Sequence, residues 1–383
     1  MGNPRRKGAW RMGLLSLLVL GGPGMAGACE GTDFYIGTQG SGPGQGVFTA
    51  RLDEKQGTLC LVGLAAELER PTWVEAHPTK PLLYAASDDK AGNETRGRVI
   101  ALRTDGADGR LTAFSSADSA GAGATHLAFD AKGKAVFTAN FRSGTVGAVP
   151  VAADGTLSAP TGSVQNAGTG PKPRLTSPHA HGVALEAGGR YLFVPDLGAD
   201  KLFVYRYDAK AGTLAPANVP SVSLPPGTGP RHVALHPKGR FVYLLYEFSP
   251  VIWVYKQGAK TGGLTLLQSL ATGTDDEADA VKGAEIAISA DGRFIYTSTR
   301  GENMIGVHAV KRDGTLREVQ RVPSGGKVPW SFRLGPKDKW LLATNQGSNS
   351  ITLFRRDART GRLKPSGQPL SVTLPTSVAF LKG

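Results

Sequence analysis

Hydrophobic and polar positions along this chain follow a pattern that recurs seven times: a short alternating apolar run, a turn around Pro/Ala-x-Gly-Arg/Lys, and a second apolar run. The cleanest copies are residues 126–137, 232–243 and 285–296. Apolar residues at every second position, many of them β-branched or aromatic, are typical of strands that face a core. Each copy therefore predicts two antiparallel strands joined by a tight turn.

A Gly-x-Leu motif ends each unit, and successive motifs lie about 50 residues apart. The motif leucines are Leu59, Leu111, Leu157, Leu214, Leu264, Leu316 and Leu363. A third predicted strand precedes the motif, for example at residues 201–207 and 350–355, and a more variable fourth follows, such as residues 221–224. Four strands in about 40–50 residues are typical of one blade of a β-propeller.

The two ends of the chain carry complementary parts of one unit. Residues 34–37 have the character of a second strand without a first, whereas residues 375–380 have that of a first strand without a second. Pairing these ends would complete the seventh unit and remove an exposed sheet edge. We therefore predict an all-β fold, a seven-bladed β-propeller closed by its N- and C-terminal strands.

Residues 1–28 have the pattern of a secretory signal peptide. Arg5, Arg6, Lys7 and Arg11 precede an apolar run at residues 14–20. Small residues at positions 26–28 then offer a cleavage site, and the run is too short to span a bilayer. The rest of a twin-arginine pattern is missing, so we expect ordinary secretion. This predicts a periplasmic or secreted domain of residues 29–383 with no transmembrane segment.

The chain has two cysteines, Cys29 at the predicted new N-terminus and Cys60 in the first unit. An oxidising compartment would permit a disulfide between them, which we expect. Lipid attachment at Cys29 is the less favoured alternative, because Ala26 stands where a lipobox usually has leucine and no flexible tether follows. Two free thiols remain a third possibility.

The chain is basic, and removal of the leader lowers its formal net charge from +13 to about +9. A basic surface attracts anions, but these lysines and arginines are scattered among turns without a basic helix or a dense run. We therefore expect no nucleic-acid partner. The charge serves general solubility or, alternatively, a focused site for an anion.

Equivalent positions in successive blades form rings around the central channel, so aligning the repeats predicts which residues meet. The position just before each first strand holds Thr72, Thr125, His181, Arg231, Ala284, Trp330 and Thr376. The position that ends each second strand holds Gln39, Asp88, Phe141, Leu197, Glu247, Arg300 and Gln346. The two strands are antiparallel, so both rings lie on one face of the disc. Four ionisable residues, His181, Arg231, Glu247 and Arg300, are thereby predicted to gather on this rim.

These four residue types can act on an anionic or carbonyl substrate. Two guanidiniums can hold a carboxylate or phosphate and stabilise an oxyanion, and a His/Glu pair can move protons. The alternative is that Arg231 and Glu247, from one unit, form a structural ion pair. Polar neighbours on the same rim are expected to contact the substrate: His179, Asp196, Asn345 and Gln346.

Other candidates carry weaker signals. His179 and His181 have metal-ligand spacing but no third ligand nearby, so we predict neither a metal nor another cofactor. Strand histidines are expected to be packing or turn residues: His126, His232 and His236. Residues 275–279 are interpreted as a solvated acidic loop, with calcium binding as the alternative. A nucleophile elbow, a P-loop and a dinucleotide fingerprint are all missing.

The chain resembles the seven-bladed lactonase family, which contains propeller-type bacterial 6-phosphogluconolactonases and fungal carboxy-cis,cis-muconate lactonizing enzymes. The resemblance covers about residues 34–381 and rests on the segments 177–182, 194–200, 229–232, 284–289, 299–301 and 343–346. It implies a channel-mouth site in which a histidine, a glutamate and two arginines act on a lactone. The matching residues are the same four, namely His181, Glu247, Arg231 and Arg300.

Two positions depart from the family pattern, since Trp330 stands where an arginine is common and Tyr246 where an asparagine is common. We expect an exported, metal-independent, monomeric lactonase that hydrolyses a small anionic lactone, with a sugar lactone as one possible substrate. Glu247 or His181 would activate water, and the two arginines would hold the anion. The alternatives are a non-catalytic propeller that binds a ligand or partner in the envelope and a muconate-type lactonizing cycloisomerase.

Overall fold

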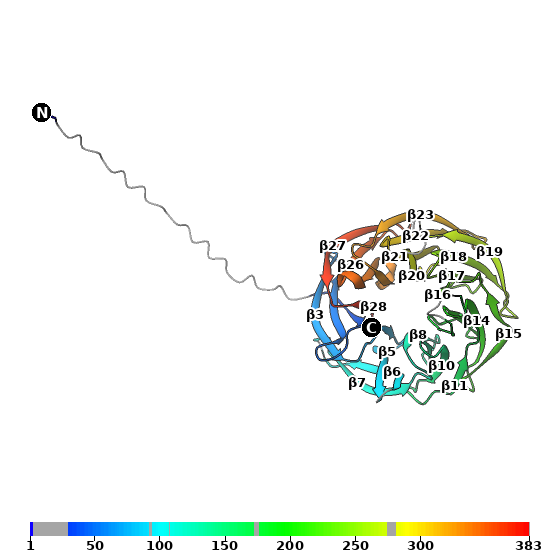
Figure 1. The fold of residues 1–383 in the computed structure, drawn as a ribbon. Coiled ribbons are helices and arrows are strands. Elements are labelled where there is room, and N and C mark those ends of the chain that lie inside the picture. The colour runs from blue at the N-terminus through cyan, green and yellow to red at the C-terminus, as the bar shows by residue number, and fades with distance from the viewer. Residues whose placement is uncertain (3–29, 92–93, 107, 172–175, 274–280, 383) are drawn as a thin grey trace.

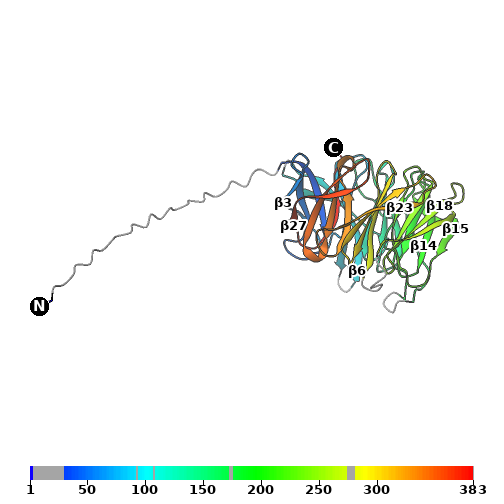
Figure 2. The same cartoon turned by 90° about the horizontal axis from the view of Figure 1, so that it is seen from above.

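The computed structural model describes residues 1–2, 30–91, 94–106, 108–171, 176–273 and 281–382. Seven four-stranded antiparallel sheets stand around a common axis (Figure 1), and the ring of blades is a shallow disc when it is turned on its side (Figure 2). The predicted all-β, seven-bladed propeller is therefore confirmed. The predicted signal peptide, residues 1–28, lies almost entirely outside the described residues, as does Cys29.

Each blade uses its strands in the same order from the channel outward. The first comprises β28 (Pro375–Ala379), β1 (Thr32–Thr38), β2 (Gly46–Asp53) and β3 (Thr58–Glu67). The second and third comprise β4 (Trp73–Ala76), β5 (Leu82–Ala91), β6 (Glu94–Thr104) and β7 (Leu111–Asp118), then β8 (Ala124–Phe129), β9 (Ala135–Asn140), β10 (Thr145–Pro150) and β11 (Gly162–Gln165). The fourth comprises β12 (Ala184–Leu185), β13 (Tyr191–Asp196), β14 (Lys201–Asp208) and β15 (Thr213–Ser223).

The remaining blades repeat this arrangement. The fifth comprises β16 (Pro230–Leu235), β17 (Phe241–Tyr246), β18 (Val251–Gln257) and β19 (Leu264–Ala271). The sixth comprises β20 (Lys282–Ile288), β21 (Phe294–Arg300), β22 (Met304–Val310) and β23 (Leu316–Pro323). The seventh comprises β24 (Pro329–Leu334), β25 (Trp340–Asn345), β26 (Ser350–Arg356) and β27 (Leu363–Ser371), with short 3-10 turns at η2 (Pro336–Asp338) and η3 (Gln346–Ser348).

The ring closes through the two ends of the chain. Strand β28 pairs antiparallel with β1, with Tyr35 opposite Ala379 and Ile36 opposite Val378. Both partners are buried, so closure joins their apolar side chains to the core and pairs a strand edge that would otherwise be open. The predicted closure is confirmed.

The hydrophobic core lies between neighbouring blades. A tyrosine on the second strand of a blade reaches the next blade and donates its hydroxyl hydrogen to a glycine carbonyl there: Tyr84 to Gly155 at 2.6 Å and Tyr296 to Gly361 at 2.9 Å. Both rings are fully buried. Burying a side chain of this size contributes roughly 1.5–3 kcal/mol, so these contacts help to fix the spacing of the blades and of the residues around the channel.

A one-residue bulge in the innermost strands decides what faces the channel. Between β16 and β17, Pro230 pairs with Tyr246 and His232 with Leu245, which leaves Arg231 without a partner in the ladder. The same register shift occurs beside Trp330 in β24 and between Gly283 and Ile286 in β20. A bulge re-aims the side chains around it. Consecutive residues of an inner strand can therefore both serve the channel.

The described part of the chain contains no helix that is long and apolar enough to cross a lipid bilayer.

Candidate active site

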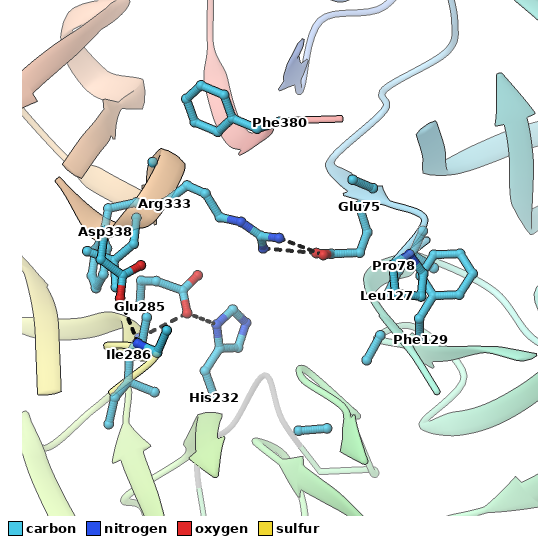
Figure 3. A pocket seen from close by; sticks show the side chains of 18 of the residues that line it. Glu75, Pro78, Leu127, Phe129, His232, Glu285, Ile286, Arg333, Asp338 and Phe380 are labelled. Atoms are coloured by element: carbon cyan, nitrogen blue, oxygen red, sulfur yellow. Dashed lines mark hydrogen bonds and ion pairs between the residues drawn. The ribbon is translucent and has the colours of Figure 1, made fainter. Parts of the chain in front are cut away.

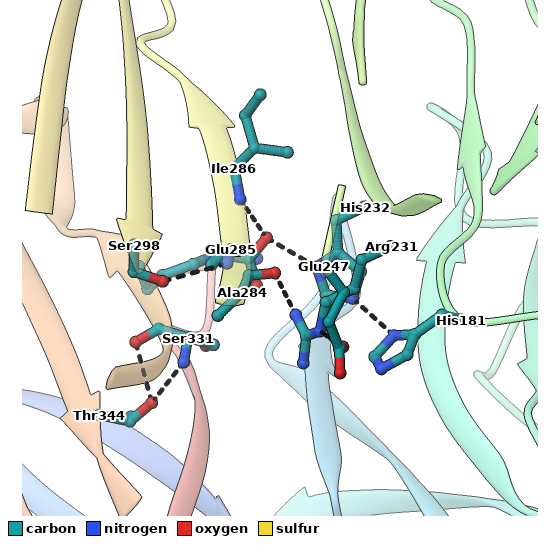
Figure 4. Close-up of polar contacts among 12 residues, drawn as sticks. His181, Arg231, His232, Glu247, Ala284, Glu285, Ile286, Ser298, Ser331 and Thr344 are labelled. Carbon is teal, nitrogen blue, oxygen red and sulfur yellow. Dashed lines mark hydrogen bonds and ion pairs between the residues drawn. The ribbon is translucent and has the colours of Figure 1, made fainter. Parts of the chain in front are cut away.

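Four side chains that lie far apart in the sequence meet at one mouth of the channel. Glu247 follows β17, and its Oε2 accepts hydrogen bonds from Arg231 Nε at 3.1 Å and from Arg300 Nη2 at 2.9 Å. Arg300 ends β21 in the next blade. The imidazole of His181, from the blade on the other side, is bonded to His232 and lies close enough to Arg231 and Arg300 to interact with their charges (Figure 4). The structure thus brings together the four residues that repeat alignment selected.

The two carboxylate oxygens of Glu247 differ in their contacts. Oε2 is committed to both guanidiniums, whereas Oε1 has no protein partner among the described residues and stays open to solvent. The ion pair between Arg231 and Glu247, which the sequence allowed as an alternative, is present and extends to Arg300. The oxygen that accepts from both guanidiniums is occupied by these bonds and cannot also take a proton from water. The free oxygen, Oε1, can instead accept a hydrogen bond from a substrate hydroxyl.

Arg231 and Arg300 differ in how far a ligand can approach them. Arg231 is 1% exposed and also donates from Nη1 to the carbonyl of Ala284. Burial, followed by repulsion from Arg300, lowers the pKa of Arg231 to about 10, so it remains a cation at neutral pH. Arg300 is 13% exposed and donates from Nη2 to the carbonyl of Gly283 at 3.2 Å. Arg300 is therefore the more accessible of the two guanidiniums.

Trp330 contacts both arginines. Its ring centre lies 5.4 Å from the guanidinium carbon of Arg231 and 5.2 Å from that of Arg300. Cation–π contacts at such distances contribute about 0.5–2 kcal/mol each. The residue that departs from the family pattern thus supplies an aromatic wall to the site where a third cation would otherwise stand.

His181 is buried beside these charges and keeps one ring nitrogen accessible. Its Nδ1 lies 3.2 Å from Nε2 of His232, and its ring meets the edge of Phe141. Burial, followed by the positive charge of Arg231, holds the pKa of His181 well below its usual value. Nε2 has no protein partner among the described residues and stays open to solvent. A neutral imidazole with a free nitrogen can accept a proton from water.

A second ring of polar residues lies directly beneath the first, and sequence reasoning did not assign it to the site. His232 Nδ1 lies 2.9 Å from Glu285 Oε1, and the same oxygen accepts a hydrogen bond from the backbone N–H of Ile286 at 2.9 Å. The rings of His126 and His232 meet edge to face, with 4.8 Å between the ring centres. The expectation that His126 and His232 pack in the interior holds, yet His232 also bonds to His181.

The repeat alignment itself contained the signal for this ring. Its members stand one position beyond the first ring: Trp73, His126, Gly182, His232, Glu285, Ser331 and Ser377. Three of these seven positions hold titratable side chains, namely two histidines and a glutamate.

A cavity of about 1020 Å³ opens on the other face of the disc, among the turns that follow the inner strands (Figure 3). Arg333 and Glu75 face each other across it and bond through both carboxylate oxygens, at 2.7 and 3.1 Å. His232 and Glu285 line this cavity, whereas the four residues of the rim do not. These two side chains thus lie between the rim site and the opposite cavity.

Asp196 and Asn345, expected to contact the substrate, are both enclosed with no exposed surface. Asp196 accepts hydrogen bonds from the Asn166 amide at 2.7 Å and from the backbone N–H of His179 at 2.7 Å. Asn345 donates to Thr352 Oγ1 at 3.0 Å. Both side chains bind neighbouring loops and are enclosed in this structure, and a role in substrate contact stays a prediction.

His179 and Gln346 lie on the rim and are half-buried. His179 Nδ1 lies 2.7 Å from the carbonyl of Phe141, and its ring stacks on that residue. Gln346 donates from Nε2 to Gln39 Oε1 at 2.5 Å. These contacts leave both residues beside the channel mouth, and a role in substrate contact remains a prediction.

The remaining candidates from the sequence are a metal site, a turn histidine, an acidic segment and a disulfide. Among the described residues, no group of three or more His, Cys, Asp or Glu side chains is arranged to hold a metal ion. His236 accepts a hydrogen bond from the backbone N–H of Lys238 at 3.1 Å, so its predicted turn role is confirmed. The acidic segment 275–279 lies outside the described residues. The Cys29–Cys60 pairing stays a prediction, because the structure describes only Cys60, in β3.

Comparison with known proteins is consistent with this geometry. Residues 33–380 match the protein-family model described as Lactonase, 7-bladed beta-propeller. A 6-phosphogluconolactonase of Bacillus subtilis is 34% identical over 348 residues, which is 91% of this chain and 97% of that protein. The periplasmic gluconolactonase of Pseudomonas aeruginosa is 30% identical, with a TM-score of 0.84 over 92% of this chain and 99% of that one. A protein from Lactobacillus plantarum superposes equally well, at 31% identity over 92% and 99% of the two chains.

Proposed function

The chain belongs to the seven-bladed β-propeller lactonase family, a family of lactone hydrolases, and from this premise we propose that it hydrolyses a small unphosphorylated sugar lactone outside the cytoplasm. The observation that carries the proposal is the cluster at the channel mouth, in which Glu247 holds two arginines beside a neutral, accessible histidine. This cluster offers one proton acceptor and one accessible cation to a carbonyl substrate.

The charge balance favours a substrate without phosphate. Two guanidiniums and the carboxylate that they share leave one net positive charge, and Trp330 adds an aromatic surface in place of a third cation. A phosphate ester carries a charge of about −1.5 to −2 at neutral pH. One net cation matches the single negative charge of the oxyanion formed when water adds to a lactone carbonyl. A neutral sugar lactone therefore fits better than the anionic lactone expected from the sequence.

In the proposed reaction, Nε2 of His181 takes a proton from water as the oxygen of that water attacks the lactone carbonyl carbon. Arg300 stabilises the negative charge that develops on the carbonyl oxygen, because its guanidinium is already held in place by Glu247. Collapse of the tetrahedral intermediate breaks the bond to the ring oxygen, and this oxygen recovers the proton from His181. The product is the open-chain sugar acid.

The proposed location rests on two observations. The first 28 residues have the pattern of a secretory signal, and the relative from Pseudomonas is a periplasmic gluconolactonase. An unphosphorylated sugar lactone is the more accessible substrate in such a compartment, because phosphorylated sugars are formed inside the cell.

Proton release from gluconolactone and from 6-phosphogluconolactone by the purified mature protein tests the proposal. We expect turnover above the spontaneous rate with both, and a higher kcat/KM for gluconolactone. Glu247→Gln is the control, because it removes the charge that binds both arginines and should lower turnover of either substrate. No acceleration across a panel of sugar lactones would refute the proposed function.

A further inference from the structure

Three buried side chains form a continuous hydrogen-bonded chain from the rim site toward the opposite cavity. His181 Nδ1 lies 3.2 Å from His232 Nε2, and His232 Nδ1 lies 2.9 Å from Glu285 Oε1 (Figure 4). The exposed fractions of these side chains are 7%, 4% and 5%. They come from three successive blades, so the ring geometry itself creates the chain.

The chain fixes the tautomer of His181 when Glu285 is ionised. A carboxylate only accepts hydrogen bonds, so Nδ1 of His232 must carry its hydrogen. Nε2 of His232 is then an acceptor, and Nδ1 of His181 must carry the hydrogen between the two rings. This leaves the accessible Nε2 of His181 unprotonated, which is the form that can take a proton from water. A protonated Glu285 would reverse every bond and place a hydrogen on Nε2 of His181.

Electrostatics disfavour a positive charge on either histidine. Burial and the nearby guanidinium of Arg231 hold the pKa values of His181 and His232 well below the usual range. Burial raises the pKa of Glu285 to about 7, although Arg231 from β16, His126 from β8 and Arg333 from β24 all face it and favour its ionised form. In a Ser-His-Asp triad the carboxylate stays ionised. The carboxyl group in this chain is much easier to protonate.

We propose that His232 and Glu285 act as a proton relay for His181, with Glu285 as the terminal acceptor. The inference rests on the proposed lactonase function. As water gives a proton to Nε2 of His181, the hydrogen on its Nδ1 passes to Nε2 of His232. The hydrogen on Nδ1 of His232 then passes to Oε1 of Glu285. All three groups end neutral, and no imidazolium forms beside the two arginines. The reverse transfers return a proton to the ring oxygen that leaves the lactone carbonyl.

The terminal group of the relay stands beside the cavity on the opposite face. Oε2 of Glu285 is buried and has no hydrogen-bond partner among the described residues, and Glu285 lines the cavity of about 1020 Å³. The relay therefore ends on the side away from the rim that a substrate would occupy. The relay thereby sets a pH limit on activity from a site that the substrate does not touch.

Replacement of Glu285 by glutamine separates orientation from proton transfer. The amide oxygen of Glu285→Gln can still accept the hydrogen of His232 Nδ1, but it cannot take up a proton. We expect kcat to fall about 100-fold with little change in KM, because a positioned general acid–base contributes about 10²–10⁴. The limb of the pH profile near neutrality should disappear. Asp130→Asn is the matched control, since it removes a carboxylate from the lining of the same cavity and Asp130 is not among the groups that face Glu285, and it should keep both the wild-type kcat and that limb.

Histidine tautomers measured by long-range 15N–1H correlation spectra test the relay without substrate. In the wild type, His181 and His232 should both carry hydrogen on Nδ1 above neutral pH and on Nε2 at about pH 5, with one shared midpoint. The spectra of His181→Gln and His232→Gln show which signals belong to which histidine. If both tautomers stay unchanged across this range, or if Glu285→Gln retains the wild-type kcat and pH limb, the relay is overturned.

The kinetic experiment and the tautomer measurement together separate the relay from the function on which it rests. A protein that exchanges its tautomers as described but accelerates no lactone hydrolysis refutes the proposed function and supports the proton chain. A protein that hydrolyses lactones while its tautomers ignore Glu285 refutes the relay and leaves the function standing.

Discussion

Glu247 binds Arg300 across a blade boundary, with 2.9 Å between Oε2 and Nη2. The same oxygen also accepts from Arg231, so one carboxylate orients both guanidiniums of the site. Arg300 is the member of this pair that a substrate can reach. Its position is thus set before substrate binds, which is what electrostatic stabilisation of an oxyanion requires.

Arg300→Ala should abolish most of the turnover without unfolding the protein. Loss of an oxyanion donor lowers kcat by about 10²–10³, and Glu247 keeps its bond to Arg231. Arg300→Lys should recover part of kcat, because it restores the charge without the planar fork. Steady-state kinetics together with thermal melting check this. An alanine variant with wild-type kcat would rule out the assigned role.

Arg231→Ala should mainly lower the free energy of unfolding. The change leaves Glu247 half-paired and the Ala284 carbonyl without its donor, and breaking a buried ion pair costs about 3–5 kcal/mol. Urea denaturation measures the loss. The control is Arg293→Ala, whose pair with Asp291 has side chains that are 53% and 41% exposed; that loss should be at most about 1 kcal/mol. Equal losses in the two variants would contradict the prediction.

Trp330→Arg should shift specificity toward phosphorylated lactones. A third cation beside Arg231 and Arg300 adds attraction for a phosphate and removes the aromatic wall. We expect the ratio of kcat/KM for 6-phosphogluconolactone over gluconolactone to rise about tenfold, equivalent to about 1.4 kcal/mol. Trp330→Phe, which keeps an aromatic wall, should leave the ratio near that of the wild type. An unchanged ratio in the arginine variant would show that Trp330 does not set specificity.

Glu285 should make the fold less stable as the pH rises toward neutrality. Its pKa rises from 4.5 to about 7 on folding, so the native state binds more protons than the unfolded state between these values. The free energy of unfolding therefore falls as pH increases across this window, by roughly 3 kcal/mol. Glu285→Gln should reduce this slope in urea titrations at a series of pH values. A slope equal to that of the wild type would place the pKa of Glu285 near its ordinary value.

The fold was predictable because each unit repeats its alternating strands and its turn. The fragments at the two ends, residues 34–37 and 375–380, also predicted closure, since neither could complete a blade alone. The repeat fixed the register well enough to bring Arg300 and Glu247 to the same rim. The alternation of apolar and polar residues within each strand and the length of the repeat were enough to predict these features.

The second ring was harder to predict, because strict alternation assigns only one of two consecutive strand residues to the channel. The bulge at Arg231 breaks that rule and lets His232 serve the channel as well. His232 was therefore expected to be a packing or turn residue, and Glu285 was not singled out as a candidate. Repeat alignment also could not show the burial of Asp196 and Asn345: each is the last residue of a second strand and lies enclosed, where its polar atoms bind neighbouring loops.

The most direct test is kcat for gluconolactone in the wild type and in His181→Gln, measured by proton release with the spontaneous rate subtracted. The account predicts rapid turnover by the wild type and a loss of about 100-fold or more in a folded variant, because the proton acceptor for water is gone. A His181→Gln protein that retains the wild-type kcat would contradict the assignment of this histidine and, with it, the proposed mechanism.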